Sequence, residues 1–128
     1  MAALHGNAEG LRAAYAGMSK FPVAAALDDL VEDSCAANRE TWTDMMIGGG
    51  AQFSQFDELG SIFTPFCSII GADDVVLSVT DQLATAAAVP GGRAVVLSGL
   101  GHLMPAEDPD RVVNEIRTSL TLLEAAAV

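Results

Sequence analysis

Apolar residues over positions 1–47 recur at intervals of three, four or seven, with good helix formers between them. This is the spacing of one face of an α-helix. The pattern predicts two helices, the second running from about Pro22, a tolerated first helical position, to the three glycines at 48–50. We expect these glycines to form a hinge. The recurring apolar residues are Leu4, Leu11, Tyr15, Met18, Val23, Leu27, Leu30 and Val31.

The pattern changes in the second half of the chain. Residues 51–64 mix apolar and polar side chains and are assigned to helix and loop. Two short apolar runs at 66–70 and 94–97, each followed closely by glycine, predict buried strands. The alanine-rich stretch 77–89 between them predicts a helix that ends before Pro90. Strand, helix and strand form a βαβ unit, so the predicted fold class is α/β with parallel strands and a right-handed crossover.

A last helix is predicted to cover the sheet. Asp108 suits its N-cap and Pro109 its first turn, and its apolar stripe consists of Val112, Val113, Ile116, Leu120 and Leu123. We therefore expect a helical segment at 1–64 and a βαβα segment at 65–128, packed as one structural unit. Two strands make a poor parallel sheet, because such strands are normally buried within larger sheets. Another chain, an upstream segment or strands hidden in the N-terminal half would have to complete it.

Composition and charge narrow the function classes. The 128 residues suit one domain, and a hydrophobic share of 51% argues against disorder. A net charge of -11 disfavours binding to nucleic acid and to anionic membranes. No apolar run approaches the roughly 20 residues that span a bilayer, and the N-terminus has no signal-peptide pattern, so we expect a cytoplasmic protein. Cys35 and Cys67 are expected to be reduced thiols, and His5 and His102 are too scattered for a metal site.

Asp74 and His102 carry the clearest chemical pattern. Each follows one of the two predicted strands, and the carboxyl ends of parallel strands meet at one edge of a sheet, where catalytic groups gather. An aspartate there can hold one nitrogen of a histidine while the other nitrogen takes a proton from a nucleophile, as in a Ser-His-Asp triad. A Gly-x-x-Asp sequence after a strand is also common in turns and helix caps. Asp73 would replace Asp74 if the loop were shifted by one residue.

Residues 65–120 resemble the C-terminal part of the α/β-hydrolase fold family. The first strand with the loop after it looks like the family's acid strand, and the second loop looks like its histidine loop and the start of its final helix. The residues that carry the resemblance are Pro65, Gly71-Ala72-Asp73-Asp74, Gly101-His102, Glu107 and Pro109. The resemblance implies that Asp74 orients His102 as general base. It also implies hydrolysis of an ester or similar acyl bond through an acyl-enzyme, without a metal or organic cofactor.

The family's nucleophile motif is missing from these residues. No G-x-S-x-G occurs, and neither does the glycine-rich oxyanion loop. The nearest approach, Gly17-Met18-Ser19-Lys20-Phe21, has Phe21 in place of the last glycine and follows a helical pattern instead of a strand. We therefore expect the serine to lie outside this chain. The chain would then be a fragment of a hydrolase, with little or no turnover alone.

Residues 1–64 occupy the place of the family's helical lid, a match of position and not of motif. In that interpretation, apolar side chains would form the wall of a pocket for a small apolar substrate. The alternative is that they are ordinary core residues. The candidate substrate-binding residues are Trp42, Met45, Met46, Phe53 and Phe56 of this segment and Met104 after His102.

Two other function classes stay open. A non-catalytic α/β module, such as a pseudoenzyme, would bind a small apolar ligand or a protein partner where the sheet is incomplete. It would self-associate or pair with a chain that completes the sheet. An acidic all-helical interaction protein would require both apolar runs, at 66–70 and 94–97, to be helical.

Overall fold

The computed structural model describes residues 4–21, 23–47 and 53–126. The chain divides into two compact units, a helical unit of Met1–Gly17 with Pro22–Ser54 and a C-terminal unit of Met18–Phe21 with Gln55–Val128. The sequence predicted a boundary between residues 64 and 65. The C-terminal unit begins earlier, after Ser54, and also takes in the short segment Met18–Phe21 from the first part of the chain.

The helical unit contains α1 (Ala8–Met18), α2 (Ala24–Ala36) and α3 (Arg39–Ile47). Its core consists of one buried residue from each helix, Leu11, Val31 and Trp42, with further side chains packed around them. The hydroxyls of Tyr15 and Ser34 form a hydrogen bond between α1 and α2. The apolar spacing in the sequence therefore predicted that this part of the chain is helical. Met18 itself, the last residue of α1, is grouped with the C-terminal unit.

The prediction of one continuous second helix was wrong. The helix breaks after Ala36, and Asn38 caps a separate helix, because its side-chain Oδ1 accepts hydrogen bonds from the backbone N–H groups of Glu40 and Thr41 at 2.9 and 3.3 Å. The first helical residue of α2 is Ala24, two positions later than predicted. The hinge expected at 48–50 lies outside the described residues.

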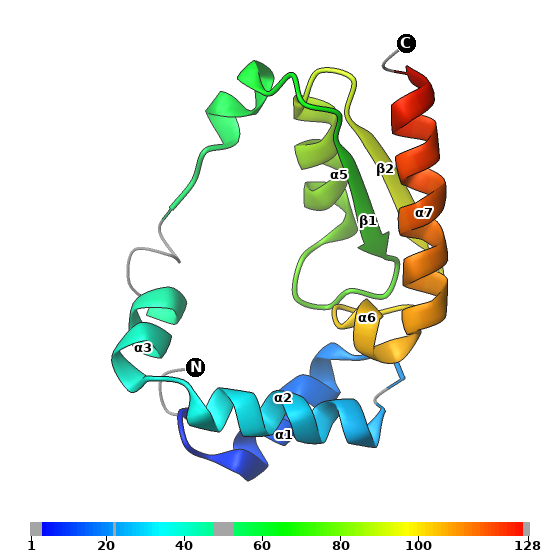
Figure 1. Cartoon of the computed structure of the whole chain (residues 1–128). Helices are drawn as coiled ribbons and strands as arrows, with labels where there is room; N and C mark the ends of the chain where they lie inside the picture. Colours follow the sequence, from blue (N-terminus) through cyan, green and yellow to red (C-terminus); the bar gives the residue numbers. More distant parts are fainter. Residues whose placement is uncertain (1–3, 22, 48–52, 127–128) are drawn as a thin grey trace. The chain divides into compact units, whose positions relative to one another are not determined.

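The C-terminal unit is an α/β structure (Figure 1). A 3-10 helix, η2 (Phe56–Ser61), precedes β1 (Cys67–Gly71), and α5 (Val79–Ala88) then leads to β2 (Arg93–Leu97). The two strands pair in parallel, with Cys67 opposite Arg93 and Gly71 opposite Leu97. This confirms the predicted βαβ unit and the α/β class. Both apolar runs are strands, so the all-helical alternative is wrong.

Helices flank the two strands (Figure 1). Side chains alternate between the faces of a strand, so neighbouring residues such as Ile69 and Ile70 lie on opposite faces. Ile69 packs against a cluster that includes Val112 of α7 (Pro109–Ala126), so α7 covers that face. Ile70 is fully buried on the other face, and α5 contacts both strands. A four-residue helix, α6 (Met104–Glu107), connects β2 to α7.

Only part of the predicted stripe on α7 is covered. The N-cap prediction is confirmed, because Asp108 accepts a hydrogen bond from the backbone N–H of Arg111 at 3.1 Å. Val112 is buried, whereas Val113, Ile116 and Leu120 of the same stripe are exposed. Among the helices that the structure describes, none is both long enough and apolar enough to cross a membrane.

The sheet has open edges within the described residues. The backbone N–H of Arg93 donates to the carbonyl of Phe66, and the N–H of Ala72 donates to the carbonyl of Leu97. In the segment 66–72, the even-numbered residues therefore direct their backbone groups toward β2. Cys67 and Ile69 lie between them and therefore direct their N–H and C=O groups away from β2. No further described strand pairs with that edge.

Candidate active site

Asp74 and His102 meet just beyond the carboxyl ends of β1 and β2. Nδ1 of His102 lies 3.0 Å from Oδ2 of Asp74. The Asp74 side chain is 5% exposed and that of His102 is 30% exposed, so the carboxylate is buried beneath a partly accessible imidazole. The predicted placement of these two groups side by side is confirmed.

Four donors hold the Asp74 carboxylate. Oδ1 accepts hydrogen bonds from the backbone N–H groups of Val76 and Leu77 at 2.8 and 2.9 Å. Oδ2 accepts one from the side-chain amide of Gln82, on α5, at 3.1 Å in addition to the contact with His102. Asp74 therefore stabilises the turn after β1 with one oxygen and orients the imidazole with the other. Asp74 thus makes the turn contacts that are common for a Gly-x-x-Asp sequence and also the contact with His102.

The ionised form of Asp74 is favoured. Burial acts to raise its pKa, but the hydrogen bond from His102, those from the Leu77 and Val76 amides and the charge of His102 together hold the pKa below its usual value. An ionised carboxylate can only accept hydrogen bonds, so Nδ1 of His102 must be the donor. In the neutral imidazole, Nε2 is then the nitrogen without a proton, which is the form that a general base requires.

Backbone hydrogen bonds join the two loops that carry these residues. The N–H of Ala72 donates to the carbonyl of Leu97 at 3.0 Å, and the N–H of Asp73 donates to the carbonyl of Leu100 at 2.9 Å. The N–H of His102 in turn donates to the carbonyl of Met18 at 2.9 Å. Both loops are thus fixed through their main chains, independently of the side chains of Asp74 and His102.

Glycine is required where the loops cross. A Cβ on Gly71 would lie 2.2 Å from the carbonyl oxygen of Gly101 and 2.6 Å from that of Leu100. Gly99, in the turn that leads from β2 to His102, has a φ of +75°, a conformation that residues with a Cβ rarely adopt. The glycines of the sequence motif therefore permit the close passage of the histidine loop over the end of β1.

Comparison with known proteins gives a structural match without a sequence match. No protein-family model matches the chain, and no curated protein matches it. The structure is similar to the crystal structure of a serine hydrolase involved in carbazole degradation, the CarC enzyme, with a TM-score of 0.76 and 16% sequence identity. The chain has the fold of part of an α/β hydrolase. The similarity covers 90% of this chain and 47% of the CarC chain, so this chain spans about half the length of that hydrolase.

Within this hydrolase fold, Asp73 is not the partner of the histidine. Its Oδ1 lies 3.2 Å from Nζ of Lys20, in an exposed ion pair. Ser19, the residue before Lys20, comes directly after α1, so it does not lie on the strand-to-helix turn of a nucleophile elbow. The structure thus selects Asp74 over the alternative that a one-residue shift of the loop would have given.

Trp42, a candidate for the pocket wall, lies in the core of the helical unit. Its side chain is 6% exposed and packs with Leu11 and Val31. Its ring also meets that of His5 edge to face, with centroids 6.3 Å apart. Trp42 therefore has the surroundings of a core residue, the alternative considered for it above.

The other candidate wall residues are placed differently from one another. Phe53 and Phe56 are exposed. Met104 packs partly buried against the cluster of Leu97, Leu100 and Val112 beneath α7. The side chains of Met45 and Met46 lie outside the described part of the structure.

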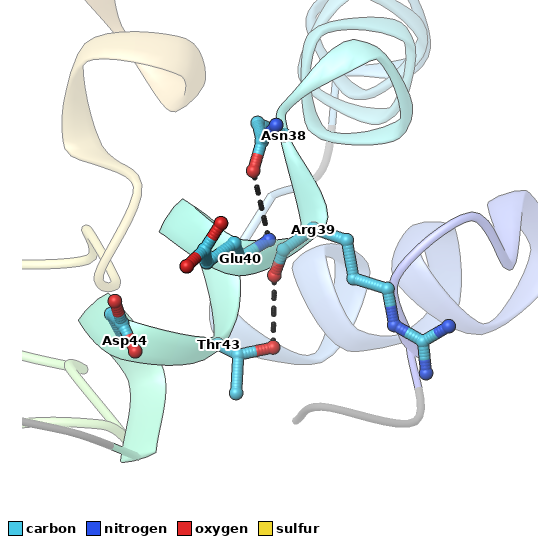
Figure 2. Close-up of a pocket in the computed structure, with 5 residues that line it drawn as sticks. All are labelled: Asn38, Arg39, Glu40, Thr43 and Asp44. Atoms are coloured by element: carbon cyan, nitrogen blue, oxygen red, sulfur yellow. Dashed lines mark hydrogen bonds between the residues drawn. The ribbon is translucent and has the colours of Figure 1, made fainter.

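The helical unit has a hollow whose lining includes neither Asp74 nor His102. The hollow has a volume of about 500 Å³ and is formed by polar residues at the start of α3 (Figure 2). The hydrogen bonds among its lining residues are local ones, such as that from the Thr43 hydroxyl to the carbonyl of Arg39, and belong to the helix itself. In the described ranges, no three His, Cys, Asp or Glu side chains come together as metal ligands would.

Sequence reasoning missed the residues that support the dyad from elsewhere in the chain. Gln82 donates both to Asp74 and to the carbonyl of Leu77, and nothing in the sequence marks it out from other helical glutamines. The segment Met18–Phe21 contacts both loops, although it is far from them in the sequence. The sequence signal in this segment was its imperfect G-x-S-x motif, which suggested a nucleophilic serine instead of a contact with these loops.

We predict that Gly71→Ala separates the two loops, because its Cβ would overlap two backbone carbonyl oxygens that cannot move like a flexible side chain. The free energy of unfolding should fall by about 1–3 kcal/mol, as for overpacked sites, and NMR should show loss of the His102–Asp74 hydrogen bond. Gly60→Ala is the control, because a Cβ there meets nothing within 4 Å. A Gly71→Ala protein with unchanged stability and an intact hydrogen bond would contradict the prediction.

Asp74 should make the stability of the protein depend on pH in the acidic range. Its pKa is lower in the folded than in the unfolded protein, so its stabilising effect is complete above the unfolded value of about 3.9 and is lost as the pH falls toward the folded value. The stability difference between wild type and Asp74→Asn should therefore be largest above about pH 5 and shrink at lower pH. Urea unfolding across this range measures it, with the exposed Asp57→Asn as baseline. A difference that does not change with pH would count against this assignment.

Proposed function

We propose that this chain supplies the acid and the histidine of a Ser-His-Asp hydrolase, with Asp74 orienting His102 as general base. The observation that carries the proposal is the hydrogen bond from Nδ1 of His102 to a buried carboxylate that three other donors hold in place. The partial exposure of His102 leaves its ring accessible to a reacting group. The fold of part of an α/β hydrolase supports the same assignment.

The proposed relay consists of the serine, His102 and Asp74. It would hydrolyse an ester or a similar acyl bond in two steps. In the first, a serine Oγ bonds to the acyl carbon while its proton passes to Nε2 of His102, and Nε2 then protonates the departing alcohol. In the second, water attacks the acyl-enzyme, gives a proton to Nε2, and the serine recovers a proton as the acid leaves. Asp74 stabilises the imidazolium in both steps and keeps its own negative charge.

The serine would come from a polypeptide that completes the sheet at the open edge of β1. Three observations support this. The chain contains no G-x-S-x-G, its similarity covers about half of a serine hydrolase, and Cys67 and Ile69 direct their backbone groups to the side where no described strand pairs. A strand added there would place its own carboxyl end beside Asp74, because β1 ends at that same edge.

The surroundings of Asp74 favour an apolar, uncharged substrate. Val75, Val76 and Leu77 follow the acid directly and are exposed, with Val75 at 73%. The hydrogen bonds from Val76 and Leu77 to Asp74 fix their backbone, so this apolar surface is held next to the relay. The net charge of -11 disfavours an anionic substrate.

A non-catalytic binding module is the second candidate, and the exposed side of α7 favours it. Val113, Ile116 and Leu120 form an exposed apolar row on that helix, and such rows commonly mark interaction sites. In this alternative, the hydrolase fold is retained as a scaffold and the exposed row binds a protein partner or a second copy of the chain.

The purified chain tests the proposed relay. We expect only background hydrolysis of p-nitrophenyl butyrate and no labelling by a fluorophosphonate, with the same result for His102→Ala, because both reactions need the missing serine. ¹⁵N NMR should nevertheless show the His102 proton on Nδ1 and a bare Nε2, a pattern that Asp74→Asn removes. Saturable turnover abolished by His102→Ala would place the serine within these residues, and a proton on Nε2 instead of Nδ1 would reject the relay.

Sedimentation tests the second candidate. If the exposed row on α7 is a binding surface, the wild-type chain should self-associate or bind the apolar dye ANS, and Leu120→Glu should abolish this. Thr118→Glu is the matched control, because it adds the same charge at an exposed position of the same helix. A compact monomer that binds no dye would argue against the binding module.

A further inference from the structure

Glu107 contacts the histidine loop and has no part in the relay itself. It is the last residue of α6, and its Oε2 accepts a hydrogen bond from the backbone N–H of Gly101 at 2.9 Å. Its other oxygen, Oε1, is buried and accepts no hydrogen bond from the residues that the structure describes. A buried carboxylate oxygen without a donor is destabilising, so the position of this side chain calls for an explanation.

The main chain around His102 is enclosed from two directions. Gly101 is buried, and a Cβ on it would lie 2.8 Å from the backbone N of Lys20 and 2.9 Å from both the carbonyl oxygen of Met18 and Oε1 of Glu107. Gly101 is therefore in close contact with the segment at Met18 and Lys20 and with the Glu107 carboxylate. No side chain larger than hydrogen fits there without displacing one of them.

The backbone N–H groups of Gly101 and His102 each have a fixed acceptor. The N–H of Gly101 donates to Glu107, and the N–H of the next residue, His102, donates to the carbonyl of Met18 at 2.9 Å. Together they set the direction in which the His102 side chain leaves the main chain. The Nδ1–Oδ2 distance of 3.0 Å depends on that direction, because Asp74 is itself held by three other donors and cannot follow a displaced imidazole.

We propose that Glu107 is a positioning residue for His102, acting through the peptide of Gly101 and not on the reacting atoms. The inference rests on the proposed relay, since it assigns a role in orienting the base of that relay. Glutamine at this position would keep an oxygen acceptor for Gly101 and would replace the unpaired carboxylate oxygen by an amide nitrogen. Methionine would fill a similar volume and remove the acceptor, which leaves the buried N–H of Gly101 without a partner.

The test is the Nδ1–H proton of His102 followed by NMR in the full 128-residue chain. We expect Glu107→Gln to retain the wild-type signal of this proton, and Glu107→Met to make the proton exchange with solvent at least about tenfold faster. Glu115→Met is the matched control, because Glu115 is also a half-buried glutamate near the C-terminus but its contact is with Ser119. Wild-type behaviour of Glu107→Met would overturn the inference.

Three further comparisons separate the possible failures. If Glu107→Met does not fold by circular dichroism, Glu107→Asp replaces it, since the shorter side chain keeps the charge and withdraws the acceptor; a wild-type signal in that variant would equally overturn the role. If the wild-type chain itself shows no proton on Nδ1, the proposed relay fails and not only the role of Glu107. If the wild-type signal is present and sensitive to Asp74→Asn but insensitive to every Glu107 variant, the relay stands and Glu107 has no positioning role.

Discussion

The parallel pairing of β1 and β2 is the constraint on which the C-terminal unit depends. The register places Gly71 opposite Leu97, so both strands end at the same level and their following loops must cross. The crossing is possible because Gly71 has no side chain, and it is fixed by main-chain hydrogen bonds such as that from Asp73 to Leu100. Asp74 and His102 are brought together as a consequence, because each lies in the loop that follows one of these two strands.

Electrostatics then determine what the pair can do. The Asp74 carboxylate is buried, which by itself would favour its neutral form, but its hydrogen-bond donors reverse that preference. Those donors include the imidazole of His102 and two backbone amides of the turn that contains Asp74. The ionised carboxylate can only accept hydrogen bonds, and this selects the tautomer of His102 that has its proton on Nδ1.

The sequence predicted best the features that depend on local patterns. Two apolar runs followed by glycine and then by Asp74 or His102 gave both strands and the dyad, because strand period, strand end and parallel pairing follow from nearby residues. The break between α2 and α3 was missed although Asn38, a good N-cap residue, marked it. The prediction of one continuous helix followed the apolar residues on both sides of the break and gave less weight to Asn38.

Other features could not be predicted because they depend on residues that are distant in sequence. The burial of Trp42 depends on Leu11 and Val31 from two other helices, and the support of Asp74 depends on Gln82 after a loop whose path the sequence does not specify. The exposure of Ile116 and Leu120 on α7 is a third case. Their spacing predicts a buried stripe, but the width of the sheet decides how much of the stripe is covered, and two strands cover only part of it.

The pair of Asp74 and His102 is complete in its contacts although the described sheet has two strands. Every described contact that orients Asp74 and His102 comes from β1, β2, the loops after them, α5, α6 or the segment Met18–Phe21. None of these contacts requires a further strand at the open edge of β1. Asp74 and His102 are therefore held in place by the C-terminal unit itself, and under the proposed function the serine would approach them from the open edge of β1.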